Sequence, residues 1–552
     1  MKKIILSFTL SSFIIFNWNC ETDIPVAQSR VVIGVPADAE TLNPLFAVSL
    51  TEGQINELLF LGLVKHDWDE NAADITSSPL LAESWEWNKD STSVTFFLRE
   101  NSFWSDGIKL TSEDILFSFD LYSDPEVNSK FFGSYDNLFT EKNQHINLKK
   151  SFEIISPTKI RINFKPGSKP SLFDIDMPIL PKHTFSKIPR KDLSTANIEK
   201  DIVTNGPYTL SSWKRNEAII LTAVKNSFLY KNDMVKELIF KIIPDENSSL
   251  TQLKKGEIDL IEDVSTEAIA DLKKNDHIKI VARTGRDYDY IGWNNIDPEL
   301  YSKSKAIKPN KFFGSAKVRK ALSYAINSEE ILKEYLQGFG QLSFGPVSPI
   351  FKNYYNPELK SYEYNPSKAK EILASEGWLD RNQNGIMEKN NLEFSFKLFI
   401  GSGNARRTFA ATVVKNDLKA VGIDVTIETM EMSAFINKLF EHELDAFMAG
   451  WTIPLPIDLQ PFWHSDFNRS PFNLSGFSNT EVDKILNALE VEKSREKKVI
   501  LYKKIQELLH ENEPVTFLYW LDVKTAFNSR IENITINPLG AIQQCWNWRI
   551  KK

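Results

Sequence analysis

One short segment carries side chains suited to binding a hard cation. Residues 380–385 read Asp-Arg-Asn-Gln-Asn-Gly, with oxygen-bearing side chains at Asp380, Asn382 and Asn384 and a glycine at the sharp turn. This is the first half of a calcium-binding loop. The twelfth position of such a loop supplies a bidentate glutamate, and here it is Asn391. The spacing therefore favours a plain turn held by Asn and Asp side chains, with weak calcium binding as the alternative.

Residue patterns that accompany catalysis are absent from the sequence. It contains no GxSxG, HExxH or P-loop motif, and none of its seven histidines has a histidine partner four residues away. Ser-x-x-Lys recurs in this lysine-rich chain, for example at Ser302, Ser367 and Ser494, and Gly401-Ser-Gly403 lacks the third glycine of a dinucleotide loop. We therefore expect a protein that is not an enzyme and that holds no cofactor or dedicated metal.

The segment 450–465 combines three prolines with large aromatic residues, among them Trp451, Phe462 and Trp463. The prolines argue against a regular helix, so we expect a loop. Aromatic rings held by a rigid, exposed loop would form a platform for a ligand. The same rings could instead fill the core beneath a long loop, and the sequence leaves both possibilities open.

Length and charge restrict the class of protein. A chain of 552 residues suggests three to four structural units or one large multi-lobed protein. Hydrophobic residues make up 42% of the chain and aromatic residues 12%, which excludes global disorder. The 66 basic and 73 acidic residues give a net charge of −7, so a basic nucleic-acid-binding surface is disfavoured.

The first twenty residues have the pattern of an export signal. Lys2 and Lys3 precede an uncharged, mostly apolar stretch from Ile4 to Phe16, which is too short to span a membrane. We expect residues 1–19 to be a signal peptide and Cys20 to be the lipidated first residue of the mature protein. Trp18 and Asn19 depart from the small residues usual before such a cysteine, so plain cleavage is the alternative. Cys545 then remains as a buried structural thiol.

Hydrophobic periodicity and turn residues predict the elements that must position any site. Residues 31–33 indicate a buried strand, and Thr111 begins a helix that ends before Pro125. Val318, Leu322, Ala325 and Ile326 lie on one helix face. Further helices are expected between Asn365 and Gly377, over 482–489 and over 499–509, and boundaries between lobes near 205–208 and 286–293.

Several blocks of sequence, in a consistent order, resemble the family 5 extracellular solute-binding proteins of ABC importers. The strongest is PLLAESWEWNKDSTSVTFFLRENSFWSDGIKLTSEDILFSF at 79–119. The others are NGPYTL (205–210), the 293–332 stretch, YNPSKAKEILASEGW (364–378), KAVGIDV (419–425), LDAFMAGW (444–451) and FSNTEVDKIL (477–486). The resemblance covers nearly all of residues 30–540.

The resemblance implies an α/β, type II periplasmic-binding-protein-like fold with three lobes. Lobe I would be discontinuous, comprising 28–55, 201–287 and 512–552, with lobe II at 56–200 and lobe III at 288–511. Ligand would be enclosed between lobes, and the closed form would be read by the transmembrane permease subunits. A monomer in the periplasm or cell envelope, anchored through Cys20, is the expected state.

The resemblance also suggests a ligand class. Peptide-binding relatives place an Asp three residues after a Gly-Trp pair to hold the peptide α-ammonium, but here that position is Pro454. Asp458 would be the substitute, with Trp451 and Trp463 as stacking walls. Peptide is therefore the leading ligand class and oligosaccharide the second, while an adhesin or a hydrolase is the alternative from another class. Four further residues complete the expected ligand-binding set: Gly450, Thr452, Asn294 and Glu40.

Overall fold

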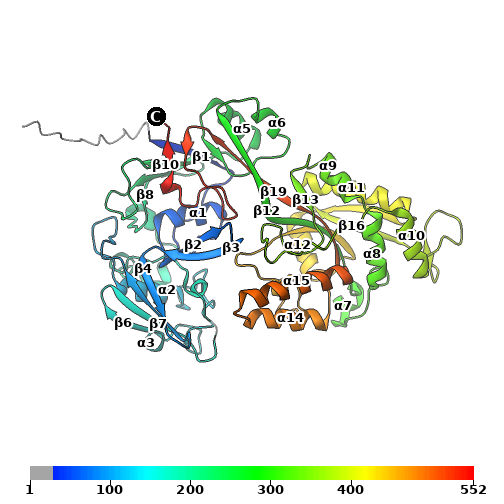
Figure 1. Ribbon diagram of the computed structural model, residues 1–552, viewed down its shortest axis with the longest axis horizontal. Coiled ribbons are helices and arrows are strands. Elements are labelled where there is room, and N and C mark those ends of the chain that lie inside the picture. The colour runs from blue at the N-terminus through cyan, green and yellow to red at the C-terminus, as the bar shows by residue number, and fades with distance from the viewer. Residues whose placement is uncertain (1–28, 169, 552) are drawn as a thin grey trace, which may run out of the picture.

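A sheet of eleven strands runs through most of the molecule in the computed structural model, which describes residues 29–168 and 170–551 (Figure 1). The strand order is β17 (Asp424–Met430), β16 (Ser395–Gly401), β18 (Ala446–Thr452), β12 (Ile278–Trp293), β19 (Val515–Asn528), β11 (Leu260–Ile261), β1 (Arg30–Val35), β10 (Glu237–Ile242), β9 (Ala218–Ala223) and β8 (Tyr208–Lys214), with β13 (Gly340–Leu342) paired to β19. The expected strand at 31–33 is confirmed within β1.

Two long strands join the halves of this sheet. β12 and β19 pair antiparallel over almost their whole lengths, and the pairing is interrupted between Thr284 and Tyr288 and again after Asp289. On one side β19 continues to β11 and β1, and on the other β12 continues to β18. Figure 1 shows these two strands crossing from one part of the molecule to the other. The large sheet therefore has a first half (β8 to β11 and β1) and a second half (β16 to β18).

A second, smaller sheet forms a separate body with its own core. Its strands are β4 (Ala82–Trp87), β5 (Ser93–Leu98), β7 (Lys159–Asn163) and β6 (Phe152–Ser156), packed with α2 (Ser112–Tyr122), α3 (Leu148–Ser151) and α4 (Lys182–Phe185). The buried residues of this core all lie between Leu45 and Ile198, and they include Trp104 and Phe119. A hairpin of β2 (Val64–Asp69) and β3 (Asp74–Pro79) extends beside it.

Several helices begin where the sequence predicts. Asn365 accepts from the backbone N–H of Lys368 at the start of α10 (Pro366–Ser375). Val318, Leu322 and Ala325 are all buried in α8 (Ala316–Ala325), and α2 begins at the capping box of Thr111. The expected pair near the C-terminus is α14 (Thr480–Val491) and α15 (Arg495–Asn512). These predictions are confirmed because each depends on residues close together in sequence.

The remaining elements are short or lie at the edges. They are α1 (Leu50–Leu59), α5 (Glu246–Lys255), α6 (Ile269–Leu272), α7 (Pro298–Ser304), α9 (Ser328–Glu334), α11 (Ala405–Ala420), α12 (Met432–Phe440), α13 (Gln460–Trp463), β14 (Glu388–Lys389), β15 (Leu392–Glu393), β20 (Ile531–Glu532) and β21 (Arg549–Ile550), with 3-10 turns at Leu172–Ile175, Arg190–Asp192, Ile198–Asp201 and Cys545–Asn547. Across 29–168 and 170–551, no helix combines the length and the apolar character needed to cross a membrane.

Candidate functional site

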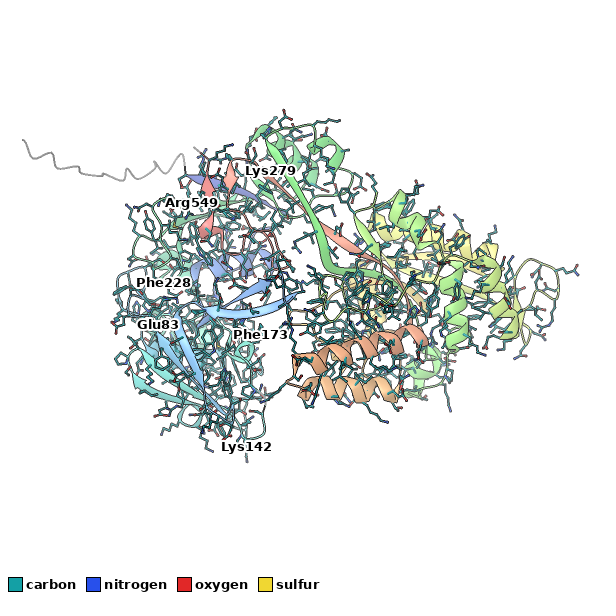
Figure 2. The ribbon with its side chains drawn as sticks, in the orientation of Figure 1. Glu83, Lys142, Phe173, Phe228, Lys279 and Arg549 are labelled. Atoms are coloured by element: carbon teal, nitrogen blue, oxygen red, sulfur yellow. The ribbon has the colours of Figure 1, made fainter. Side chains whose placement is uncertain are left out.

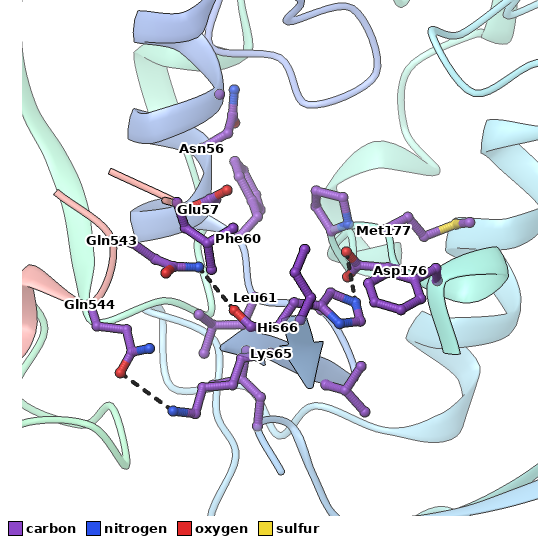
Figure 3. A pocket seen from close by; sticks show the side chains of 18 of the residues that line it. Asn56, Glu57, Phe60, Leu61, Lys65, His66, Asp176, Met177, Gln543 and Gln544 are labelled. Carbon is purple, nitrogen blue, oxygen red and sulfur yellow. Dashed lines mark hydrogen bonds and ion pairs between the residues drawn. The ribbon is translucent and has the colours of Figure 1, made fainter. Parts of the chain in front are cut away.

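A cavity of about 430 Å³ lies where several distant parts of the chain meet (Figure 3). Its walls come from α1, from β2 and from residues 173–178, and the C-terminal segment 539–546 adds a further wall. Leu455 reaches the cavity from the segment that follows β18 in the second half of the large sheet. The volume falls in the range of small-molecule sites, about 300–1,000 Å³.

The capping box at the start of α1 fixes the direction of that helix. Ser49 caps the helix, and the buried carboxylate of Glu52 accepts backbone N–H bonds from Glu40, Thr41, Val48 and Ser49 at 2.7–3.2 Å. Burial alone would raise the pKa of Glu52, but these N–H donors outweigh burial and lower it. The helix is held firmly at its N-terminus, and its later residues Asn56 and Glu57 line the cavity.

Unpaired polar groups line the cavity. Asn56 is 3% exposed, and neither its amide nitrogen nor its oxygen has a hydrogen-bond partner. The amide nitrogen of Gln543 donates to the backbone oxygen of His66 at 3.0 Å, but its buried oxygen has no partner. Because buried polar groups are normally paired, these atoms mark places for a ligand or ordered water.

The carboxylate of Glu57 is the charged group of this set. Its side chain is exposed to the cavity that it lines, yet burial by the surrounding protein raises its pKa to about 7. The carboxylates of Asp176 and Glu262 add to the rise, while Lys130 and His66 oppose it. Among the described residues no hydrogen bond or ion pair to this carboxylate is present, so it is available to a ligand.

The opposite wall carries a histidine–carboxylate pair. His66 Nε2 lies 3.1 Å from Asp176 Oδ2, and the imidazole stacks on Phe173 with ring centroids 4.2 Å apart. Its Nδ1 lies 3.1 Å from the hydroxyl of Ser77, so the ring orientation is fixed from both sides. Figure 3 shows His66 and Asp176 facing each other, away from α1.

The two lysines of the cavity already have partners. Lys65 Nζ lies 2.9 Å from Asp67 and donates to the side-chain oxygen of Gln544 at 3.3 Å. Lys130 Nζ donates to the backbone oxygen of Ala47 at 2.7 Å, and burial lowers its pKa. Neither ammonium is free to hold an anion without losing these contacts.

The segment 450–465 departs from the loop that the sequence suggests. Trp451 belongs to the end of β18, and Phe462 and Trp463 lie in the short helix α13, where Pro461 occupies the first turn. Phe462 and Trp463 are 7% and 4% exposed and pack in the core, Trp463 against Phe477 and Phe517. The expectation of three aromatic rings on a loop is wrong, because proline is compatible with the first turn of a helix.

Trp451 alone of the three keeps part of its ring exposed. It meets Phe462 and Phe472 with centroids 5.2 and 5.1 Å away, and Tyr288 and Tyr290 line the same small pocket of about 10 Å³. This pocket is separate from the cavity at α1, so the structure does not bring Trp451 together with Glu57.

Asp458 is exposed and has no cation beside it in the described structure. Its carboxylate accepts the backbone N–H of Gln460 at 3.0 Å. Desolvation by the surrounding protein raises the pKa of Asp458. The backbone N–H of Gln460 opposes this rise, and the carboxylate of Glu490 adds to it. It follows Leu455 by three residues but does not itself line the cavity.

The other sequence-predicted ligand residues are spread over the molecule. Asn294 is fully buried and uses its side-chain amide to hold the backbone oxygens of His442 and Leu444. Thr452 is exposed and donates to Asp287, and Glu40 is exposed beside the start of α1. Gly450 faces Asp289 across the β12–β18 pair. None of the four lines the cavity at α1.

A buried ion-pair cluster surrounds Gly450. Asp289 is 1% exposed, and its carboxylate lies 2.7 Å from Arg406 Nε and 2.9 Å from Arg407 Nη2. Burial alone would raise the pKa of Asp289, but the two guanidinium groups outweigh burial and lower it. Both arginines lie in the first turn of α11, so the cluster ties that helix to β12.

The 380–385 segment forms a turn held by its own side chains. Asp380, Asn382 and Asn384 accept backbone N–H bonds from Gly385, Asn384 and Ile386 at 3.1, 3.0 and 2.8 Å. The favoured interpretation, a turn stabilised by Asx side chains, agrees with this geometry. Among the described residues, no group of three or more His, Cys, Asp or Glu is arranged to hold a metal ion.

Only one of the two cysteines, Cys545, lies in the part of the chain that the structure describes. The signal peptide at 1–19 and Cys20 lie outside the described residues. Cys545 is fully buried with a free thiol, as predicted, and burial raises its pKa.

Residues 76–472 match the model of the bacterial extracellular solute-binding proteins, family 5. The chain belongs to this family. The sequence resemblance is therefore confirmed, and so is the α/β fold of the periplasmic-binding-protein type. The bounds of the three lobes remain predictions.

Two curated relatives and one solved structure of this family illustrate its range. The chain is 26% identical to the oligopeptide-binding protein AppA of Bacillus subtilis, covering 96% of this chain and 93% of that protein. It is 25% identical to heme-binding protein A of Haemophilus influenzae, covering 86% and 84%. The structure of AppA in complex with a nonapeptide superposes with a TM-score of 0.71 at 27% identity, covering 95% of this chain and 99% of that one. The family 5 relatives are solute-binding proteins and not enzymes.

The residues that line the cavity carry no family motif in the sequence. The Ser49-x-x-Glu52 capping box could have located α1. Nothing local indicates that Asn56 and Glu57 face residues 176 and 543, which are far away in the chain.

Proposed function

We propose that this family 5 protein captures peptides outside the cytoplasm and presents them to the membrane subunits of an ABC importer. The observation that carries the proposal is the cavity at α1, which is lined from both sides of the molecule. Leu455 contributes from the second half of the large sheet, and α1, β2 and the 539–546 segment contribute from the other side. A solute bound there touches both sides only when they are close, so it favours the closed state.

The proposal also assigns Asp458 and Trp451 to ligand binding. Asp458 lies on the segment that carries Leu455, it is exposed, and its carboxylate contacts no cation in the described structure. These features support a role as the partner of the peptide α-ammonium, with the partly exposed ring of Trp451 as a stacking surface. Trp463 is not part of this proposal because it is buried in the core.

The Asp458→Asn variant tests the ammonium role. Removing a charge that pairs with a bound ammonium should weaken binding of the co-purified peptide by about 2–5 kcal/mol. Isothermal titration calorimetry measures this loss. Asp466→Asn, at a nearby exposed aspartate, is the matched control and should leave affinity unchanged. Equal affinity of Asp458→Asn and wild type would remove Asp458 from the site.

We further propose that the protein reaches its place through the signal peptide at 1–19 and remains tethered by a lipid on Cys20, in the periplasm or cell envelope. The sequence of the first twenty residues supports this. Intact-mass measurement of the mature protein tests it, since a diacylglyceryl group adds a mass that plain cleavage does not. A mature N-terminus other than Cys20 would contradict it.

Native mass spectrometry of the purified protein tests the ligand class. Co-purified masses that fragment into amino-acid residues support peptide capture. Sugar masses would replace peptide by oligosaccharide, and a bound tetrapyrrole or metal complex would exclude peptide as the resident solute. Binding to macromolecules with no small solute in any preparation would favour an adhesin.

A further inference from the structure

The basic side chains of the cavity at α1 have partners in the protein, whereas one of its carboxylates has none among the described residues. Its two ammonium groups, those of Lys65 and Lys130, already contact oxygen atoms of the protein. His66 is held against Asp176. Glu57 is left without an ionic or hydrogen-bonded partner among the described residues. This carboxylate is accessible from the cavity that it lines and has no bonded partner, so it is available to a ligand.

The cavity offers three side-chain groups with unpaired acceptor oxygens, although the amide nitrogen of Asn56, a donor, is unpaired as well. Besides the Glu57 carboxylate, the amide oxygens of Asn56 and Gln543 are buried and unbonded. A primary ammonium has three N–H donors and no acceptor. Figure 3 shows Asn56 and Glu57 coming from α1 and Gln543 from the C-terminal segment. These two segments are separated by more than 480 residues in sequence, so only the folded protein brings them to the same cavity.

The other walls suit an aliphatic chain. Most of the remaining lining is apolar, including Phe60, Leu61, Phe131 and Met177. Lysine-like groups bury their methylene stems against apolar surface while the charged head finds polar partners. The combination of an apolar wall with one unpaired carboxylate fits this shape better than it fits a carboxylate or a sugar.

We infer that this cavity binds a primary ammonium group of the solute on Glu57, with Asn56 and Gln543 as additional acceptors. The inference deepens the proposed function and rests on it in one respect, that the solute is a peptide. The ammonium can come from the peptide N-terminus or from a lysine side chain, and the experiment separates these sources. Asp458 lies outside this cavity and would hold a second cation of the ligand.

Four tripeptides compare wild type with Glu57→Gln by calorimetry at pH 8. They are Ala-Lys-Ala, Ala-norleucine-Ala and the N-acetylated form of each. Norleucine keeps the lysine stem without its ammonium, and acetylation removes the terminal ammonium. Loss of a charged hydrogen bond should weaken binding roughly 10- to 100-fold for each peptide whose ammonium reaches Glu57.

The pattern identifies the source. A lysine side chain in the cavity makes acetyl-Ala-Lys-Ala sensitive to the substitution and Ala-norleucine-Ala insensitive. An N-terminal ammonium gives the reverse result. Glu57→Gln binding all four peptides within about twofold of wild type overturns the inference.

Two controls keep the result interpretable. Glu83→Gln removes a negative charge from an exposed position on β4, marked in Figure 2, and should change no affinity. Glu57→Gln should also melt no lower than wild type at pH 8, because the substitution removes a charge whose ionisation burial opposes.

Pentylamine and pentanol decide the case in which wild type binds no tripeptide. A thermal shift by millimolar pentylamine that pentanol does not give, and that Glu57→Gln loses, would keep the ammonium site while removing peptide as the solute. No Glu57-dependent shift in that case would overturn both.

Discussion

Ionising the Glu57 carboxylate is opposed by the protein around it, and this gives solute binding a pH dependence. The carboxylates of Asp176 and Glu262 also raise the pKa of Glu57, while the positive charges of Lys130 and His66 lower it. With its pKa raised to about 7, Glu57 is mostly protonated at pH 5.5 and mostly ionised at pH 8. A bound ammonium stabilises only the ionised form. Binding therefore lowers the pKa of Glu57 and releases a proton when the solution is acidic.

We expect the affinity for the ammonium-bearing tripeptide to rise with pH, by up to about tenfold per unit, and to level off above pH 7. If the ammonium is the peptide N-terminus, the affinity falls again above about pH 8, where that amino group loses its own proton. Calorimetry at pH 5.5, 6.5, 7.5 and 8.5 measures the slope, and buffers of different ionisation enthalpy count the released proton. Any slope left in Glu57→Gln belongs to groups other than Glu57. Equal slopes in wild type and variant would contradict the role of Glu57.

Strand β18 shows how one element is shaped by the charge beside it. Gly450 lies opposite Asp289, and a Cβ built there would lie 2.6 Å from Arg407 Nη2 and 2.7 Å from the backbone oxygen of Tyr288, besides clashing with the Asp289 carboxylate. These atoms belong to the ion-pair cluster that ties α11 to β12, so they cannot move without weakening it. Gly450 was predicted to bind ligand, and the structure gives it a structural role as well.

Gly450→Ala should lower the free energy of unfolding by about 1–3 kcal/mol through overpacking. Urea unfolding at pH 7 measures this change. Gly53→Ala, within α1, is the matched control, because its Cβ would meet nothing within 4 Å. That control should raise stability by about 0.5–1 kcal/mol. A neutral Gly450→Ala would mean that the cluster adjusts without cost.

At the element scale, local patterns were enough for α2, α8, α10, α14 and α15, because caps and hydrophobic spacing act within a few turns. The segment 450–465 failed for a local reason as well, since Pro461 was taken as excluding helix when it only marks the first turn. The cavity could not be predicted from the sequence, because its lining residues are far apart in the chain. Glu57 is one exposed-looking glutamate on an ordinary amphipathic helix, and its significance arises only beside residues 176 and 543. Asp458 was found from a family pattern, and the structure leaves it outside that cavity.

At the scale of the whole molecule, the β2–β3 hairpin connects the small-sheet body to the segments that flank the second half of the large sheet. Tyr354 OH donates to Asp74 at 2.6 Å, and Asn353 and Arg495 both donate to the backbone oxygen of Ala72. Trp68 meets Phe351 with ring centroids 6.0 Å apart. The same hairpin carries Lys65 and His66 into the cavity, so these contacts hold one cavity wall in place.

Tyr354→Phe removes the hydroxyl bond to Asp74 and leaves the ring packing intact. We expect solute affinity to fall roughly three- to tenfold, as the loss of one hydrogen bond predicts, because the closed arrangement becomes less populated. Small-angle X-ray scattering of the solute-bound protein should show a larger radius of gyration in the variant. Tyr355→Phe, at the neighbouring tyrosine, is the control and should behave as wild type. Unchanged affinity in Tyr354→Phe would show that the hairpin does not contribute to closure.

The central place of β19 has a consequence for how the chain assembles. This strand lies between β12 and β11, yet it spans residues 515–528, close to the end of the sequence. Until those residues are available, the strands on either side of it have no common neighbour. Early-synthesised β1 must therefore wait for β19 before its sheet is continuous, and long-range pairing of this kind folds slowly. The strand that joins β12 to β11 is made long after both, so synthesis order and assembly order are opposed in this protein.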